Sequence, residues 1–188
     1  MKKLPALLAL PLALVAAAAF VAPQRAAHAS IESLDLRQMM KKCDAAVYGE
    51  IVARDVFFVP EQEGPGLFFT RLTLAGATLR EGVAIRVDVL FAGGVLDAEH
   101  GVYNSEAPSA DDTALGKRVV AFYKWSDDLG GGVAGNALYA AHGGLYRAVE
   151  GPLGAVALGR GPTFAVAGNT RVGALASAVR TLAAEEGR

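Results

Sequence analysis

The chain has 188 residues, of which 53% are hydrophobic and 20% charged, and its formal net charge at pH 7 is −1. This balance offers no basic surface for a nucleic acid or an anionic membrane, so neither is expected as a partner. The single cysteine, Cys43, cannot form a disulfide within its own chain, and the fold must therefore be stabilised by packing.

The first 29 residues have the layout of a bacterial signal peptide. Lys2 and Lys3 precede an uncharged apolar stretch, residues 4–21, and Ala27-His28-Ala29 is a small-x-small pattern that signal peptidase accepts. We predict cleavage after Ala29 and an exported protein, periplasmic or secreted. The alternative is that the stretch is kept as a membrane anchor, because its length is at the lower limit for a span.

Cleavage would leave residues 30–188, which are expected to form one β-rich domain. It removes three basic residues and no acidic one, leaving 15 basic and 19 acidic side chains, a net charge of −4. This length suffices for a single domain with its own core, and no second apolar run is long enough to span a membrane. We expect a monomer with an unidentified extracytoplasmic partner.

A short helix is predicted at about residues 34–42, with Ser33 as its N-cap. Leu36, Met39, Met40 and Cys43 recur at the spacing of one apolar helix face. Cys43 is therefore predicted to be a small buried hydrophobe, and a reactive thiol or an intermolecular bridge is the alternative.

Alternation with period two begins after Asp44 and predicts three strands. The first runs toward Phe58, a turn follows at residues 61–66, and the second covers residues 67–79, so the two strands form a hairpin. The third strand, residues 83–91, has the clearest alternation. Its core-facing residues are predicted to be Val83, Ile85, Val87, Val89 and Phe91.

Gly93-Gly94 ends the third strand, and no clear period returns before Arg118. We therefore predict a long polar loop at residues 95–117. Connections of this length in a compact β domain are commonly functional, so the loop is the first place to look for a site. Its polar side chains form a candidate partner-binding surface. They are Asp97, Glu99, His100, Asn104, Glu106, Asp111 and Asp112.

The remaining chain predicts one long strand, several short strands and a final helix. Residues 119–125 are apolar on both faces, which indicates a strand covered on both sides. Glycine-bounded short strands are predicted at residues 137–142, 145–149, 155–158 and 163–166. Asn169 or Thr170 can cap a closing helix with Val172, Leu175 and Val179 on its apolar face. The predicted class is mainly β, a small OB-like antiparallel barrel or meander with an N-terminal and a C-terminal helix.

No set of residues in this pattern predicts a catalytic, cofactor-binding or metal site. His100 and Ser105 share the 95–117 loop with several acids, but the Gly-x-Ser-x-Gly turn of a nucleophile is missing. The acids lack the spacing of zinc or EF-hand ligands. We therefore predict a non-enzymatic binding module; the alternative is a hydrolase or metal-dependent enzyme that uses this loop. Contact of His100 with both a carboxylate and a hydroxyl in a pocket would favour the enzyme.

Four short motifs carry a resemblance to a known group. They are Cys43-Asp44-Ala45-Ala46-Val47-Tyr48-Gly49-Glu50-Ile51-Val52, the segment 69–74, the segment 85–89 with Gly93-Gly94, and the segment 115–122. In their order along the chain, the motifs resemble uncharacterised exported bacterial proteins with an OB-like barrel of the netrin and metalloproteinase-inhibitor kind. Lys117 stands where that group has an acidic residue.

The resemblance implies a fold but no activity. Metalloproteinase inhibitors of this architecture use an N-terminal cysteine to reach the protease zinc, whereas the predicted mature N-terminus here is Ser30. The inhibitory mechanism is therefore not carried over to this chain. Oligonucleotide binding, common among OB barrels, is not expected of an acidic and exported protein.

Overall fold

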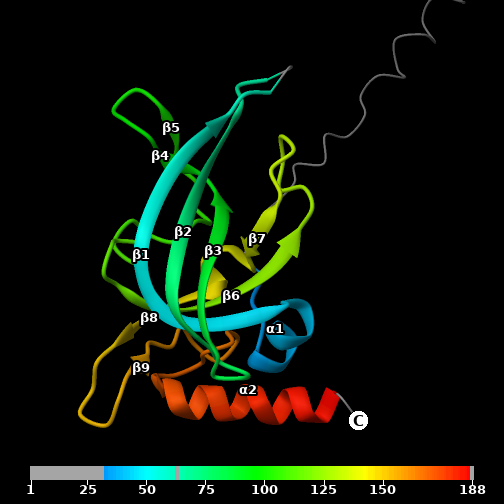
Figure 1. Cartoon of the computed structure of the whole chain (residues 1–188), viewed down its shortest axis with the longest axis vertical. Helices are drawn as coiled ribbons and strands as arrows, with labels where there is room; N and C mark the ends of the chain where they lie inside the picture. The colour runs from blue at the N-terminus through cyan, green and yellow to red at the C-terminus, as the bar shows by residue number, and fades with distance from the viewer. Residues whose placement is uncertain (1–31, 62–63, 187–188) are drawn as a thin grey trace, which may run out of the picture. The chain divides into compact units, whose positions relative to one another are not determined.

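The computed structural model describes residues 32–61 and 64–186 (Figure 1). The predicted signal peptide, residues 1–29, lies outside the described residues, and its cleavage stays a prediction. Within the described ranges, no helix is both long and apolar enough to cross a membrane.

Five strands close into a barrel (Figure 1). They are β1 (Ala45–Val59), β2 (Leu67–Thr78), β3 (Ala84–Ala92), β6 (Arg118–Ser126) and β7 (Gly135–Leu138). Their order is β1-β2-β3-β7-β6, and β1 pairs again with β6 to complete the ring. All pairs are antiparallel except β3 with β7, which meet in parallel at Leu90 and Ala137. The predicted OB-like class is confirmed, as a closed barrel rather than an open meander.

The barrel closes because β1 bends sharply and serves two neighbours. Residues 45–50 pair with β6, and a bulge between Ile51 and Ala53 interrupts the pairing with β2. Gly49 lies opposite Gly76 at the bend. A Cβ atom on Gly76 would collide with the Tyr48 carbonyl oxygen, and one on Gly49 would lie 2.7 Å from the Ala75 carbonyl oxygen. Only glycine permits this close approach of the two backbones.

The inward-facing residues of the strands form the barrel core. The predicted alternation is confirmed along most of the strands, including Leu72 and Leu74 of β2 and Val87 and Val89 of β3. Val83 is an error in the prediction, because it lies just before β3 and is 59% exposed. The fully buried members of this core include Val47, Ile51, Leu72, Leu74, Val89 and Val119.

A second core lies on the outer face of β6, as its two-sided apolar pattern predicted. Phe122 of β6 packs edge-on against Tyr146, with ring centroids 6.0 Å apart. Leu175 and Val179 of helix α2 (Val172–Glu186) are buried in the same cluster. Cys43 is also buried there, which confirms its predicted place in the core.

Helix α1 (Leu36–Lys42) starts two residues later than expected, and its N-cap is Asp35 rather than Ser33. The Asp35 carboxylate accepts from the Gln38 backbone N–H at 2.8 Å, and the Asp35 N–H donates to the Gln38 side chain at 3.1 Å. This reciprocal capping box satisfies the backbone N–H groups of Asp35 and Gln38 at once, which a cap at Ser33 would not do.

The barrel sheet continues past β6 through β8 (Leu145–Val149), β9 (Val156–Ala157) and β10 (Thr170–Arg171). Of the short strands predicted in this part of the chain, one is correct only up to Leu138, where β7 ends, and another is wrong altogether. The 3₁₀ helix η1 (Ala141–Gly144) replaces the end of the strand predicted at 137–142. Residues 163–166 form a closed turn, because the Arg160 N–H donates to the Val166 carbonyl at 3.0 Å and leaves no ladder.

The predicted long loop contains regular structure. β4 (Gly94–Val95) and β5 (Gly101–Val102) form a two-stranded hairpin that begins one residue before the predicted loop and takes up its first part. The buried Thr70 hydroxyl donates to the Gly93 carbonyl at 2.7 Å and fixes the base of this hairpin to β2. The β4–β5 hairpin and the β1–β2 hairpin both project at the upper end of the barrel in Figure 1. The two hairpins together are called the barrel tip below.

Candidate functional site

The seven candidate polar residues are not brought together. Asp97, Glu99 and His100 lie at the turn of the β4–β5 hairpin. The other four lie along the segment that leads back to β6, at Asn104, Glu106, Asp111 and Asp112. The candidate surface predicted from the sequence is therefore split into a tip group and a set of separate contacts.

Asp97 organises the hairpin turn. Its carboxylate accepts from the backbone N–H groups of Glu99 and His100, both at 2.9 Å, and contacts Nδ1 of His100 at 2.8 Å. The N–H of Glu99, followed by the His100 side chain, lowers the pKa of Asp97. The turn is therefore held by an ionised carboxylate, and this hold should be lost as pH falls through the lowered pKa.

The other four residues have different contacts. The Asn104 amide donates to the Ala92 carbonyl at 3.1 Å, and its oxygen accepts from the Glu106 N–H at 3.0 Å. The Glu106 carbonyl in turn accepts from the His142 N–H at 2.9 Å. Asp112 lies 4.0 Å from Arg160, and Asp111 is exposed. Asn104 and Glu106 thus attach the segment to the barrel.

His100 meets only part of the condition that would favour an enzyme, which was contact with both a carboxylate and a hydroxyl. The His100 ring contacts a carboxylate, but within residues 32–61 and 64–186 its hydrogen-bonding partner is Asp97 and no hydroxyl. Across the same ranges, no three His, Cys, Asp or Glu side chains are grouped as ligands for a metal ion.

The barrel tip carries an apolar pocket that the sequence analysis missed. Phe58, Phe68 and Leu96 line a hollow of about 290 Å³, with Asp97 and His100 at its edge. The Phe58 and Phe68 rings are tilted against each other with centroids 5.0 Å apart. A signal was available: Phe57-Phe58 and Phe68-Phe69 are adjacent pairs in strands, so one ring of each must face outward.

Further apolar side chains are exposed on the β4–β5 hairpin and just after it. Leu96 is 51% exposed, Tyr103 is 90% exposed, and Val95 and Val102 are also exposed. Large exposed hydrophobic groups gathered on one surface are typical of interaction sites. The tip therefore has both a pocket and exposed apolar side chains on the hairpin that carries Leu96.

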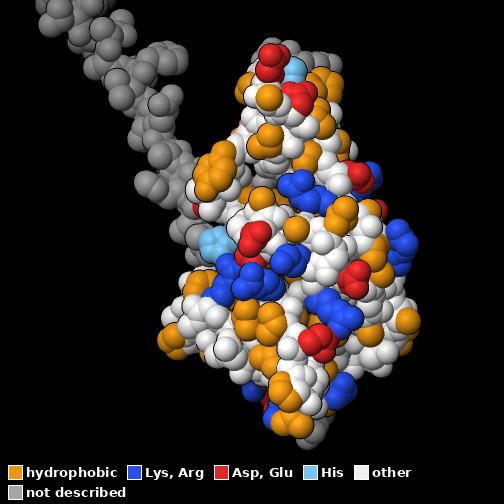
Figure 2. Space-filling view, turned by 90° about the vertical axis from the view of Figure 1, so that its left-hand side faces the viewer, with side chains coloured by type: hydrophobic (Ala, Val, Ile, Leu, Met, Phe, Trp, Pro, Cys, Tyr) orange, Lys and Arg blue, Asp and Glu red, His pale blue; other side chains and the backbone are white. Residues whose placement is uncertain are grey.

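The charge at the outer end of the barrel tip has one sign. Residues 56–70 and 93–116 contain no Lys or Arg, whereas they include Glu61, Asp97 and Glu99. Figure 2 shows acidic and hydrophobic side chains together at the upper end of the molecule, with the Lys and Arg side chains gathered lower. The apolar pocket thus opens on an acidic surface.

A second hollow, of about 310 Å³, lies on the barrel face and includes Trp125 and Asn136. Arg71 is stacked over Phe57 at 5.8 Å and paired with Asp55 at 3.2 Å. The Trp125 indole N–H donates to Asp127 at 2.9 Å, and the Asn136 amide donates to the Asp88 carbonyl at 3.1 Å. The polar groups of this hollow already bind one another.

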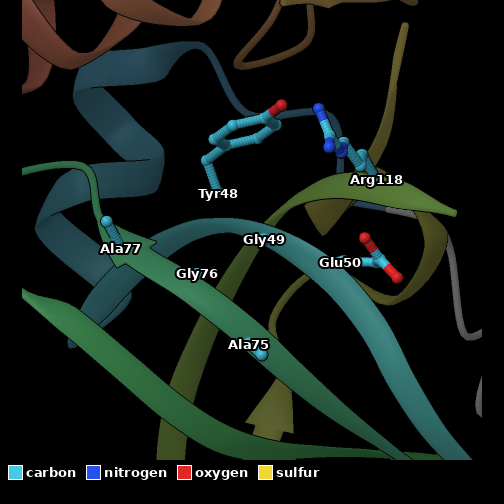
Figure 3. A pocket seen from close by; sticks show the side chains of 7 residues that line it. All are labelled: Tyr48, Gly49, Glu50, Ala75, Gly76, Ala77 and Arg118. Atoms are coloured by element: carbon cyan, nitrogen blue, oxygen red, sulfur yellow. The ribbon is translucent and has the colours of Figure 1, made fainter. Parts of the chain in front are cut away.

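A third hollow, of about 380 Å³, lies over the glycine pair at the bend of β1 (Figure 3). The Tyr48 hydroxyl faces the Arg118 guanidinium in this view. Tyr48, followed by the ion-pair partner Glu150, raises the pKa of Arg118. Small residues form the floor of this hollow, and Glu150 compensates the charge of Arg118. We therefore attribute the hollow to the absence of side chains at the bend of β1 and not to a ligand site.

Fold and site together define an OB-like barrel with an apolar pocket on an acidic tip. No protein-family model, curated protein or solved structure matches this chain. The resemblance to exported bacterial proteins stays a prediction.

Replacing His100 and Asp111 together with alanine should leave the fold intact. Both side chains are exposed, and exposed substitutions of this kind change the free energy of unfolding by about 0.5 kcal/mol or less. Thermal unfolding of the variant checks this result. A variant that melts several degrees lower than the unaltered protein would contradict it. A rise of several degrees in the melting temperature of the unaltered protein with calcium or zinc would instead favour the alternative of a metal-dependent enzyme, because an ion stabilises only a fold that binds it.

Proposed function

We propose that this protein is an exported, non-enzymatic binding module whose barrel tip captures an extended segment of a partner protein. The segment carries an apolar side chain next to Lys or Arg. The observation that carries the proposal is the pocket of Phe58, Phe68 and Leu96 within an acidic, exposed apolar surface.

The pocket determines which apolar side chain of the partner can bind. Two phenyl rings and a leucine offer no hydrogen bonds, so they favour a leucine-like or phenylalanine-like side chain. Burying one such side chain contributes about 1.5–3 kcal/mol. Aromatic and aliphatic anchors of this kind commonly dominate the binding energy of an interface.

The acidic residues of the tip favour a positively charged side chain in the partner. Asp97 lines the pocket and Glu99 lies two residues further on in the same turn, while residues 56–70 and 93–116 carry no Lys or Arg that would repel a cation. Lysine or arginine beside the anchor would increase the association rate and select against acidic partners. The same acids disfavour an anionic lipid surface as the ligand.

Short peptides test the proposal. Peptides with a central leucine or phenylalanine flanked by lysines should bind saturably, and binding should weaken as salt is added. Peptides with the same centre flanked by glutamates should bind at least about tenfold more weakly, a difference of about 1.4 kcal/mol. Isothermal titration calorimetry measures both affinities.

Leu96→Ser should weaken lysine-flanked peptide binding by about tenfold or more, because the pocket loses one wall. Leu153→Ser is the matched control: Leu153 is similarly exposed but lies in the turn between β8 and β9. Equal binding by wild type and Leu96→Ser, or preference for glutamate-flanked peptides or anionic vesicles, would refute the proposal.

A further inference from the structure

Two arginines line a hollow that belongs to neither the tip nor the barrel face. The hollow measures about 260 Å³ and is lined by Asp112, Arg147, Leu158, Gly159 and Arg160. Arg147 lies on β8, and Arg160 lies shortly after β9. The β8–β9 hairpin thus brings together two guanidinium groups that are separated by twelve residues in the sequence.

Two contacts hold the Arg160 side chain, and a third holds its backbone. Its guanidinium donates to the Leu145 carbonyl at 2.8 Å and lies over the Tyr146 ring at 5.6 Å. Its backbone N–H donates to the Val166 carbonyl at 3.0 Å. Its side chain is 24% exposed. A guanidinium fixed in this way loses little conformational entropy when it binds a ligand.

The positive charge in the hollow exceeds the negative charge. Asp112 is 4.0 Å from Arg160, which is beyond hydrogen-bonding distance. Among the described residues, no carboxylate lies within 4.0 Å of the Arg147 guanidinium. Two arginines therefore line the hollow with one carboxylate that is loosely placed beside Arg160, and N–H donors remain for a ligand.

We propose that Arg147 and Arg160 form a binding site for a phosphate or sulfate group. The planar guanidinium donates two parallel N–H groups and so matches the paired oxygens of these anions. The hollow is several times the roughly 30 Å³ share of one water molecule, so it has room for the anion and part of the molecule that carries it. This site is independent of the peptide-binding tip.

Sodium sulfate and sodium phosphate are the first probes, compared with sodium chloride at equal ionic strength. Both oxyanions should bind saturably and shift the backbone amide signals of Leu158 and Gly159 in ¹⁵N NMR spectra. Glycerol phosphate and a sulfated monosaccharide then distinguish an ester from the free ion. Tighter binding of an ester identifies a larger ligand, whereas equal binding identifies the inorganic ion.

Variants link the binding to the two arginines. Arg147→Gln and Arg160→Lys should each weaken oxyanion binding by about tenfold or more, whereas Arg86→Gln, at an exposed arginine on β3, should not. Arg147→Gln keeps the test valid if loss of the Arg160 contacts destabilises the fold. Unchanged binding in Arg147→Gln, or an equal response to chloride, would overturn the proposal.

Discussion

Replacing Gly76 with alanine should destabilise the domain by about 3 kcal/mol or more, at the upper end of the range for overpacked sites. The added methyl group would collide with the Tyr48 carbonyl oxygen, which is backbone and not a movable side chain. Relief requires β1 and β2 to separate at the bend where β1 also pairs with β6. For a domain of this size the melting temperature should fall by about 10 °C.

Gly173→Ala is the matched control for this substitution. Gly173 lies in the first turn of α2, where a Cβ atom meets no other described atom within 4 Å. Alanine is the better helix former, so the control should be neutral or stabilising by up to about 1 kcal/mol. Thermal unfolding measures both variants. A Gly76→Ala protein as stable as wild type would mean that the strands do not approach so closely.

Phe122→Ala should destabilise the domain by about 3–5 kcal/mol, the usual range for a buried phenylalanine. Phe122 is fully buried on the outer face of β6 and packs against Tyr146. Its removal leaves a cavity between the barrel and the layer that includes α2. Urea unfolding, followed by circular dichroism, gives the free energy of unfolding.

Phe58→Ala is the control for Phe122→Ala. Phe58 is 44% exposed and loses chiefly its tilted contact with Phe68, which is worth about 1 kcal/mol. The proposed function adds an opposite expectation for binding: Phe58→Ala should weaken peptide binding although it barely changes stability. Comparable destabilisation by the two substitutions would contradict the placement of Phe122 in a core.

The barrel core was predictable because alternation in β2 and β3 reports directly which side chains face inward. Val83 was misassigned because the pattern continues beyond the first paired residue of the strand. The strand predicted at residues 163–166 failed for a related reason. Short apolar segments between glycines suit a tight turn as well as a strand, and tertiary hydrogen bonds decided the outcome at Arg160.

The candidate sites were less predictable than the core. Asp97 and His100 were found because polar residues in a long connection are conspicuous, but the pocket beside them is built from the β1–β2 hairpin as well. Arg147 and Arg160 belong to segments with no sequence motif in common. Such sites depend on contacts between distant segments, which local periodicity does not encode.

The most direct test of the peptide-binding tip is an NMR titration of the protein with the lysine-flanked leucine peptide. We expect saturable shifts that are largest at Phe68, Leu96 and His100, and smaller shifts in the Leu96→Ser variant at the same peptide concentration. Shifts that are largest around Trp125 and Asn136 would place binding in the barrel-face hollow and contradict peptide binding at the tip.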